Sequence, residues 1–297
     1  MKIGYPCINL SIGCKGNKTF RLKSYTEQRL IETVSNNLQC LSEILRFNVE
    51  NNILFFRISS DLIPFASHPI CTFNWLSYFS DYFIDIGGYI KQHNIRISMH
   101  PGQYTVLNTI REDAYRNCLR ELKYHSAVMN AMRLPDSDKI QIHVGGAYDD
   151  KAVSMKRFIA RYRNLDETIQ RRLVIENDEK QYNLHDCRMI HNDIGVPILL
   201  DIFHHRLNND GTNLIDALSI TNGTWKKRHG IPMLDYSQSA SDSRKGVHIQ
   251  SIDLHSFQDF ISETFNFDFD IMLEIKDKEI SAIRALEVLK GDPRLQL

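Results

Sequence analysis

Short apolar runs alternate along this chain with longer segments in which apolar residues recur at helical spacing. Helical spacing is clear at 26–51, 111–133, 184–192 and 256–265. Most of the runs are apolar on both faces, which is typical of parallel strands covered on both sides. The expected strands are 2–7, 54–59, 95–100, 139–145, 172–177, 196–203, 231–236 and 270–276. Eight strands alternating with helices, without a linker or a change in composition, predict an α/β protein with one (β/α)8 barrel, a TIM barrel, over residues 1–297.

Polar side chains close most of these runs. The residues at the run ends are Tyr5, Arg57, His100, His143, Glu176, Asp201, Asp235 and Glu274. Their intervals fit βα units of roughly 30 residues or more. In such a barrel the carboxyl ends of all strands converge on the face that carries the chemistry. Because the last six ends all carry a histidine or a carboxylate, the sequence predicts one shared polar site there.

The same residue types indicate a metal centre. Carboxylates crowded in a partly buried mouth repel one another, and divalent cations with imidazole and carboxylate ligands relieve that repulsion. His204 follows the sixth strand and His248 lies in the loop after the seventh. The expected ligands are therefore His100, His143, Glu176, Asp201, His204, Asp235, His248 and Glu274. Eight ligands exceed the needs of one ion and predict two or three.

Mixed nitrogen and oxygen donors suit manganese, zinc or iron better than calcium. We expect manganese, with Zn²⁺, Mg²⁺ or Fe²⁺ as alternatives. A multinuclear cluster is typical of phosphodiester hydrolysis, because it activates a water and stabilises charge on the attacking and leaving oxygens.

Charge balance limits the ways in which this chain could bind nucleic acid. Lys plus Arg and Asp plus Glu number 36 each, so the formal net charge is zero. This excludes a protein that coats nucleic acid through bulk charge but allows a local basic rim. Lys226–Arg228 precede a strand and are expected on the face opposite the site. The expected rim residues follow the first and seventh strands and are Lys15, Lys18, Arg21, Lys23, Arg244 and Lys245.

Composition and cysteine spacing narrow the class further. Hydrophobic residues make up 42% of the chain, which can fill a large core. No apolar run approaches the roughly 18 residues of a membrane span, and the N-terminus lacks the long apolar region of a signal peptide. We therefore expect a cytoplasmic protein with no membrane partner. The six cysteines are scattered without a CxxC pair and predict neither a zinc finger nor a disulfide framework.

Several segments resemble a known family, and they occur in its order over most of the chain. They read GYPCINL (4–10), LRFN (45–48), FRISSDLIPFASHP (56–69), SMHPGQY (98–104), HVGGAY (143–148), IENDEK (175–180) and LDIFHH (200–205). These segments resemble the UV damage endonucleases. The resemblance implies a TIM barrel related to endonuclease IV, with a metal cluster and a DNA groove across the mouth. It also implies hydrolysis of the DNA strand immediately 5′ of cyclobutane pyrimidine dimers and 6-4 photoproducts, leaving a 3′-hydroxyl and a 5′-phosphate.

The resemblance assigns roles to individual residues. Glu176 and His68 match catalytic positions, with His68 near the scissile phosphate. Gln103 and Tyr104 resemble a wedge that enters the duplex at the lesion. The residues that match metal ligands of the family are His100, His143, Glu176, Asp201, His204, His248 and Glu274. Tyr5 and Asn9 resemble groove residues that face the damaged nucleotides.

The end of the seventh strand departs from the family pattern. Many relatives read K-x-H-x-S-Q there, whereas this chain has Asp235 in place of the histidine and Met233 in place of the lysine. A carboxylate can still bind a hard dication, so we expect Asp235 to be a ligand that favours manganese or magnesium.

Three other functions fit parts of the pattern. A metal-dependent sugar isomerase or epimerase also places Glu, Asp and His at strand ends, but it needs at most two ions and an enclosed pocket. An abasic-site endonuclease would share the whole cluster. A binding module without activity leaves the clustered ligands unexplained. The expected partner is damaged double-stranded DNA, and nothing in the sequence indicates an obligate protein partner.

Overall fold

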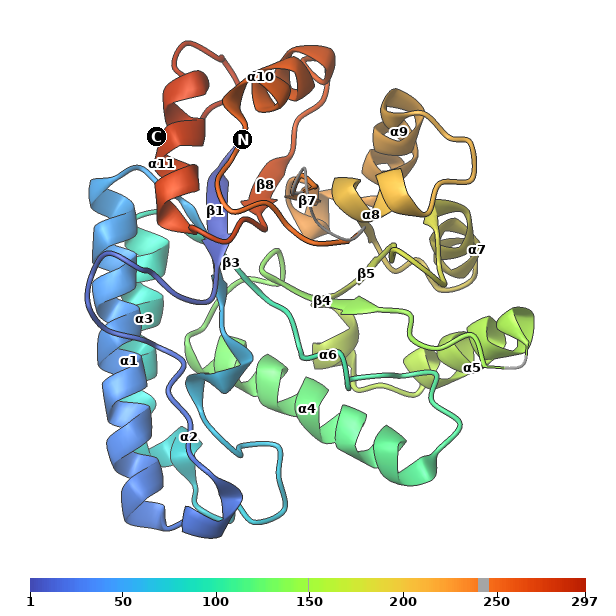
Figure 1. The fold of residues 1–297 in the computed structure, drawn as a ribbon. Coiled ribbons are helices and arrows are strands. Elements are labelled where there is room, and N and C mark those ends of the chain that lie inside the picture. The colour runs from blue at the N-terminus through green and yellow to red at the C-terminus, as the bar shows by residue number, and fades with distance from the viewer. Residues whose placement is uncertain (149, 240–245) are drawn as a thin grey trace.

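Eight parallel strands close into one barrel in the order of the sequence (Figure 1). The computed structural model describes residues 1–148, 150–239 and 246–297. Each strand pairs with the next, and β1 pairs with β8. The strands are β1 (Ile3–Pro6), β2 (Phe55–Ile58), β3 (Arg96–Met99), β4 (Lys139–His143), β5 (Leu173–Glu176), β6 (Ile198–Asp201), β7 (Met233–Tyr236) and β8 (Asp270–Leu273). The predicted TIM barrel is confirmed.

Helices surround the barrel and connect successive strands (Figure 1). The longest, α1, begins after Thr26, whose side chain accepts a hydrogen bond from the backbone of Arg29. The helices are α1 (Glu27–Glu50), α2 (Trp75–Tyr78), α3 (Ser80–Gln92), α4 (Glu112–Ala131), α5 (Lys151–Arg163), α6 (Glu167–Gln170), α7 (Leu184–Ile194), α8 (Ile202–Leu207), α9 (Leu214–Thr224), α10 (Leu254–Glu263) and α11 (Glu279–Val288). Three short 3₁₀ turns lie at Leu22–Ser24, Ser60–Leu62 and Lys227–His229.

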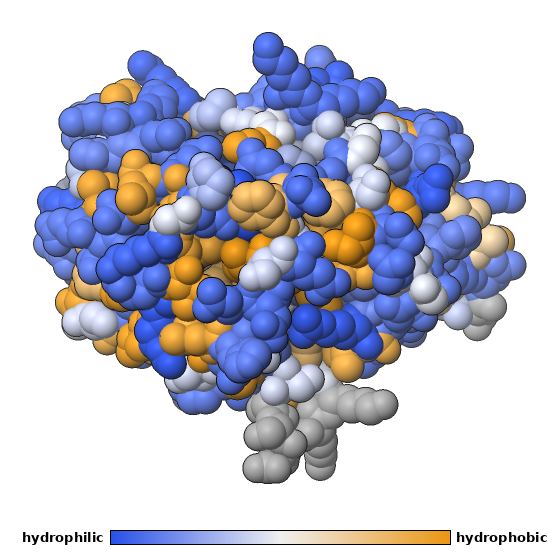
Figure 2. Space-filling model, turned by 90° about the horizontal axis from the view of Figure 1, so that it is seen from above, coloured by the Kyte–Doolittle hydropathy of each residue, from blue (hydrophilic) through white to orange (hydrophobic). Residues whose placement is uncertain are grey.

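Viewed from above relative to Figure 1, the surface carries both hydrophobic and hydrophilic residues. Figure 2 shows small groups of hydrophobic residues among hydrophilic ones on that face. Within the described part of the chain, no helix combines the length and apolar character needed to cross a membrane.

The inside of the barrel is built in layers, and the layering positions the polar site. One layer is apolar and separate from the larger core between strands and helices; it consists of Phe55, Val174, Leu199, Met233 and Met272. Side chains two residues apart on a strand point to the same face. A second inward-facing layer therefore lies two residues closer to the carboxyl ends of these strands. It consists of Arg57, Glu176, Asp201, Asp235 and Glu274. All five of these side chains are polar, so the layer above the apolar one is a charged floor.

Buried charges also close the opposite end of the barrel. Arg96 Nη1 donates to Asp270 Oδ2 at 2.7 Å, and Lys139 Nζ donates to the backbone carbonyl of Arg171 at 2.8 Å. These residues begin strands β3, β8 and β4, so they lie away from the carboxyl ends.

The structure describes only some of the basic residues expected at the rim. Lys15, Lys18, Arg21 and Lys23 are exposed in the loop between β1 and α1. Lys226–Arg228 precede β7, which agrees with the opposite face predicted for them. Arg244 and Lys245 lie outside the described residues.

The structure contains a disulfide that the spacing of the cysteines did not predict. Cys14, in the loop after β1, forms a disulfide with Cys40 of α1, and their Cα atoms are 5.8 Å apart. The loop folds back over α1, where the Lys18 backbone N–H donates to Asn37 Oδ1 at 2.9 Å. The pairing therefore follows from tertiary packing, which a search for CxxC motifs does not detect.

Removing this bridge is expected to destabilise the fold. The double change Cys14→Ser and Cys40→Ser should lower the free energy of unfolding by about 2–4 kcal/mol, because the bridge constrains the unfolded chain. Denaturant unfolding without reductant, followed by circular dichroism, measures the loss. Wild-type protein in reductant should match the double variant, and equal stability with and without the bridge would contradict this prediction.

Candidate metal centre and active site

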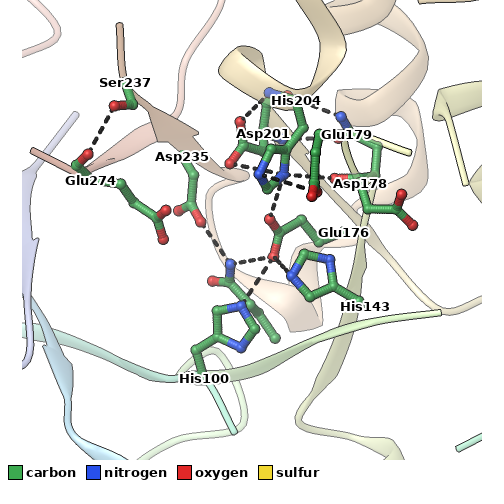
Figure 3. Close-up of polar contacts among 12 residues, drawn as sticks. His100, His143, Glu176, Asp178, Glu179, Asp201, His204, Asp235, Ser237 and Glu274 are labelled. Carbon is green, nitrogen blue, oxygen red and sulfur yellow. Dashed lines mark hydrogen bonds and ion pairs between the residues drawn. The ribbon is translucent and has the colours of Figure 1, made fainter. Parts of the chain in front are cut away.

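The carboxyl ends of the strands bring histidines and carboxylates into one cluster (Figure 3). Within three groups, one potential ligand atom from each residue lies within 4.8 Å of the others. The groups are His100–His143–Glu176, Glu176–Asp201–His204 and Asp201–Asp235–Glu274. Glu176 and Asp201 each belong to two groups, so the three form one continuous cluster. Seven of the eight predicted ligands are brought together in this way.

Glu176 lies at the centre of the cluster. It ends β5, and only 1% of its surface is exposed. Its Oε2 lies 3.4 Å from His100 Nε2 and 3.8 Å from His143 Nε2, while its Oε1 lies 3.2 Å from His204 Nδ1. Burial acts to raise the pKa of Glu176, but the surrounding imidazoles outweigh it and hold the pKa well below its usual value. Glu176 is therefore an ionised carboxylate that faces three histidines.

Asp201 positions His204 through a helix cap. Asp201 Oδ1 accepts a hydrogen bond from the backbone N–H of His204 at 2.8 Å, which caps α8. The cap leaves His204 Nδ1 at 3.2 Å from Asp201 Oδ2. Burial and the neighbouring carboxylates raise the pKa of Asp201 well above its usual value. Burial acts to lower the pKa of His204, but Glu176 and Asp201 raise it to about 11. The carboxylates thus attract a positive charge to this point.

The residues of the cluster fit divalent metal ions. Asp201 Oδ2, which faces His204 Nδ1 at 3.2 Å, is buried without a hydrogen-bond partner among the described residues. Buried polar atoms nearly always have one, so unpaired atoms at such a cluster indicate a missing partner. Burial lowers the pKa of His100, which keeps its ring neutral and able to bind a metal. Imidazoles, which release their protons on metal binding, and carboxylates together form a suitable donor set for a transition metal.

Asp235 has a different environment from the other ligands. Both of its oxygens accept hydrogen bonds from Arg57 Nη2, at 2.7 and 2.8 Å, and its Oδ2 also accepts one from Gln141 Nε2 at 2.6 Å. Arg57 Nη1 donates to Glu274 Oε1. Gln141 Nε2 donates to Glu176 Oε2 at 2.6 Å, which connects this pair of acids to the centre. A guanidinium therefore contacts Asp235 where a metal ion was predicted.

The charges of this group depend on one another. Burial acts to lower the pKa of Arg57, but Asp235 and Glu274 raise it above its usual value, so Arg57 stays charged. Burial raises the pKa of Glu274, but Arg57 outweighs this effect and lowers it to about 2. Burial raises the pKa of Asp235 to about 8 even beside Arg57. Asp235 therefore holds a proton more readily than an ordinary carboxyl group, even beside Arg57.

His248 lies at the edge of the cluster, outside the three groups. Its Nδ1 lies 2.8 Å from Ser237 Oγ, and its Nε2 lies 3.9 Å from Glu274 Oε2. A cavity of about 440 Å³ opens above His248, Glu274 and the two histidines of the first group. Lys276 and Lys278 also line this cavity. The cluster is thus open to a ligand, with positive charge at its rim.

His68, Gln103 and Tyr104 lie beside the cluster. His68 is exposed and lines a second cavity of about 640 Å³, together with Tyr104 and Arg120. Gln103 lines the first cavity, and Tyr104, which is 84% exposed, projects beside the second. The loop after β3 therefore separates the two cavities. An exposed position agrees with a wedge, whose role stays a prediction.

Tyr5 and Asn9 require a correction. Tyr5 is fully buried, and its hydroxyl donates to Asn48 Oδ1 of α1 at 2.7 Å. Asn9 is 2% exposed and donates through Nδ2 to the Tyr5 hydroxyl at 2.9 Å. Tyr5 points outwards from the barrel to pack under α1, so neither side chain faces a groove in this structure. The groove role predicted for both residues does not fit this placement.

Comparisons with known proteins agree over nearly the whole chain. The family model described as UV-endonuclease UvdE matches residues 1–294. A UV DNA damage endonuclease from Clostridium perfringens is 37% identical over 98% of this chain and 71% of its own length. One from Bacillus cereus is 30% identical over 98% of this chain and 95% of its own. The crystal structure of SacUVDE superposes with a TM-score of 0.94 at 47% identity, covering 98% of each chain.

The chain belongs to the UvdE family of UV endonucleases. Membership confirms the predicted resemblance and the predicted class of enzyme, a DNA-cleaving hydrolase. More distant structures share the barrel of this UvdE chain at much lower identity. They include endonuclease IV from Thermus thermophilus, with a TM-score of 0.57 at 12% identity, and a 3-keto-D-glucoside 4-epimerase, with 0.59 at 16%. These two likenesses concern the fold alone.

Two polar residues of this UvdE site were not assigned a function from the sequence. Arg57 ends the second expected strand, whereas the histidines and carboxylates expected to bind metal start at the end of the third strand. Gln141 lies within a strand, two residues before His143. The detectable signal was the position of each residue: a polar side chain two residues from another inward-facing residue points into the barrel. Such a residue has to pair with another polar group inside it.

Proposed function

We propose that this chain uses divalent metal ions to hydrolyse the DNA phosphodiester immediately 5′ of UV photoproducts. The products are a 3′-hydroxyl and a 5′-phosphate, and the nick starts excision of the damage. The lesions are cyclobutane pyrimidine dimers and 6-4 photoproducts in double-stranded DNA. The observation that carries the proposal is the continuous cluster around Glu176 and Asp201, which lies below an open cavity in a chain of the UvdE family.

The cluster supplies the ligands for two or three ions, manganese foremost. The residues that would hold them are His100, His143, Glu176, Asp201, His204, His248 and Glu274; Asp235, whose oxygens contact Arg57, is the eighth candidate. Bound ions supply a nucleophile from water at neutral pH and stabilise charge on the phosphate oxygens.

The protein's own side chains orient the substrate and the ions. Glu176 holds three imidazoles around one carboxylate, which fixes the geometry of the two groups that share it. Lys276 and Lys278 at the rim attract the phosphate backbone. His68 and Arg120 line the neighbouring cavity, which would receive the DNA strand close to the cleaved bond.

The wedge residues recognise damage and take no part in the chemistry. Gln103 and Tyr104 enter the duplex and replace stacking and pairing that the crosslinked dimer has already weakened. Damage therefore lowers the cost of opening the duplex at the cleavage site.

Nicking assays with three plasmids test the proposed function. Irradiated, abasic and untreated supercoiled DNA are incubated with the enzyme, with and without a chelator. Nicking of irradiated plasmid that the chelator abolishes is the expected result. Equal nicking of all three substrates would contradict lesion recognition, and activity with the chelator would contradict metal dependence. Preference for the abasic plasmid would favour the abasic-site alternative.

The sugar isomerase alternative has less support. The cavity above the cluster adjoins a second cavity across an exposed loop, and this open arrangement suits an extended polymer better than an enclosed sugar.

Replacing both wedge residues is expected to weaken lesion binding specifically. The change Gln103→Ala with Tyr104→Ala should raise the Kd for a duplex with one photoproduct by about 10–100-fold, since base stacking on an aromatic contributes about 1–3 kcal/mol. Metal content should stay unchanged, because neither side chain belongs to the cluster. Fluorescence anisotropy with damaged and undamaged duplexes measures both affinities. Unchanged affinity for the damaged duplex would rule out the wedge.

A further inference from the structure

We infer that the Arg57 guanidinium acts as a built-in cation between Asp235 and Glu274, so that this part of the cluster takes no metal ion and the site holds two. Asp235 is then a positioning residue that holds Arg57, and not a metal ligand. This inference rests on the metal-dependent function proposed above and fixes the number of ions.

The oxygens of Asp235 are already engaged in hydrogen bonds. Oδ1 faces Arg57 at 2.7 Å, and Oδ2 faces both Arg57 at 2.8 Å and Gln141 at 2.6 Å. A metal ion binds a carboxylate oxygen at about 2.0–2.2 Å. An ion on either oxygen would thus lie a few ångströms from the guanidinium in a buried site, where like charges repel strongly.

Arg57 can neither move out of the cluster nor lose its charge. It is 3% exposed and extends from the inner face of β2, above the apolar layer that contains Phe55. Gln141 Oε1 accepts a further hydrogen bond from Nη2 at 2.7 Å. A guanidinium stays protonated at any pH at which a protein folds. The chain itself therefore offsets one of the two negative charges of Asp235 and Glu274.

The total charge of the cluster also favours two ions over three. The cluster contains four carboxylates, those of Glu176, Asp201, Asp235 and Glu274, and Arg57 offsets one of them. With every ligand deprotonated, as metal binding requires, two dications bring the formal charge from minus three to plus one, which already favours a phosphate. A third dication would add two further positive charges beside an arginine.

The guanidinium of Arg57 does not contact the other two groups. Glu176 Oε2 accepts a hydrogen bond from Gln141 Nε2 at 2.6 Å and still faces the Nε2 atoms of His100 and His143, and Asp201 Oδ2 has no hydrogen-bond partner among the described residues. Glu274 uses Oε1 for Arg57 and leaves Oε2 towards His248. One ion in the His100–His143–Glu176 group and one in the Glu176–Asp201–His204 group therefore fit without displacing a hydrogen bond of Arg57.

Metal content per chain tests the inference. Purified full-length protein is stripped of metal, loaded with Mn²⁺, desalted and analysed by mass spectrometry for manganese. We expect two ions per wild-type chain and two in Asp235→Asn. We expect three in Arg57→Met, because removal of the guanidinium frees the oxygens of Asp235 and Glu274. The double variant Arg57→Met with Asp235→Asn should return to two.

Arg96→Met is the matched control. Arg96 is also buried and also pairs with an aspartate, Asp270, but at the opposite end of the barrel. Its loss should leave two ions, which separates a change in the cluster from general damage to the fold. Circular dichroism checks the fold of each variant.

Three ions in the wild type, or loss of an ion in Asp235→Asn, would overturn the inference. Two ions in a folded Arg57→Met would do the same. Asp235→Asn keeps the shape of the side chain, so its ion count decides the matter even where Arg57→Met does not fold. A wild-type chain without any ion would contradict the proposed metal-dependent function, and this inference with it.

Discussion

Glu176→Gln is expected to abolish nicking of irradiated DNA while the barrel stays folded. Glu176 is the carboxylate shared by two of the three candidate metal groups. An amide carries no charge and is a poorer ligand, so both groups lose their common donor. We expect a loss of about 10³-fold or more in the rate of nicking, equal to about 4 kcal/mol of transition-state stabilisation. Bound metal should fall together with activity.

The fold should tolerate this substitution because glutamine has nearly the same shape. Gln141 Nε2, which donates to Glu176 Oε2 at 2.6 Å, can donate to the amide oxygen of the new side chain. Nicking rates on irradiated plasmid, metal analysis and circular dichroism together measure the outcome.

Asp270→Asn is a suitable control, since it also removes a buried carboxylate within the barrel but at the opposite end. That variant should keep its metal and its nicking activity, although it loses stability. Turnover close to that of the wild type in Glu176→Gln would refute the central role of this residue.

The barrel and most of the cluster were predictable from sequence for one physical reason. Parallel strands buried on both faces leave apolar runs that are easy to detect, and a closed barrel brings all their ends to one face. The run ends at His100, His143, Glu176 and Asp201 therefore had to meet, wherever the helices between them lay.

Pairing across the barrel was not predictable in the same way. Arg57 and Asp235 are 178 residues apart, and their contact depends on which inward-facing side chains share a layer. From the sequence alone, Asp235 was one more carboxylate at a strand end. The direction of Tyr5 was also hidden, because a tyrosine that ends an apolar run can point into the barrel or outwards to a helix such as α1.

Removing divalent ions is expected to abolish nicking and also to destabilise the fold. Without ions, the four carboxylates of the cluster, three of them buried, have only Arg57 and protons to offset their repulsion. An ion present at a free concentration of 100 times its Kd adds about 2.7 kcal/mol to the free energy of unfolding. Chelation should therefore lower that free energy by about 3 kcal/mol or more, and Mn²⁺ should restore both stability and activity.

The variant Glu176→Gln tests whether this destabilisation arises at the cluster. Because that variant binds little metal, chelator should change its melting temperature far less than that of the wild type. Ca²⁺ should restore the wild type poorly, since calcium prefers oxygen ligands and the cluster presents several imidazoles. Calorimetry of both proteins with chelator, Mn²⁺ and Ca²⁺ measures the shifts. Identical melting temperatures of the wild type with and without chelator, together with undiminished nicking, would mean that the cluster stabilises its carboxylates without metal.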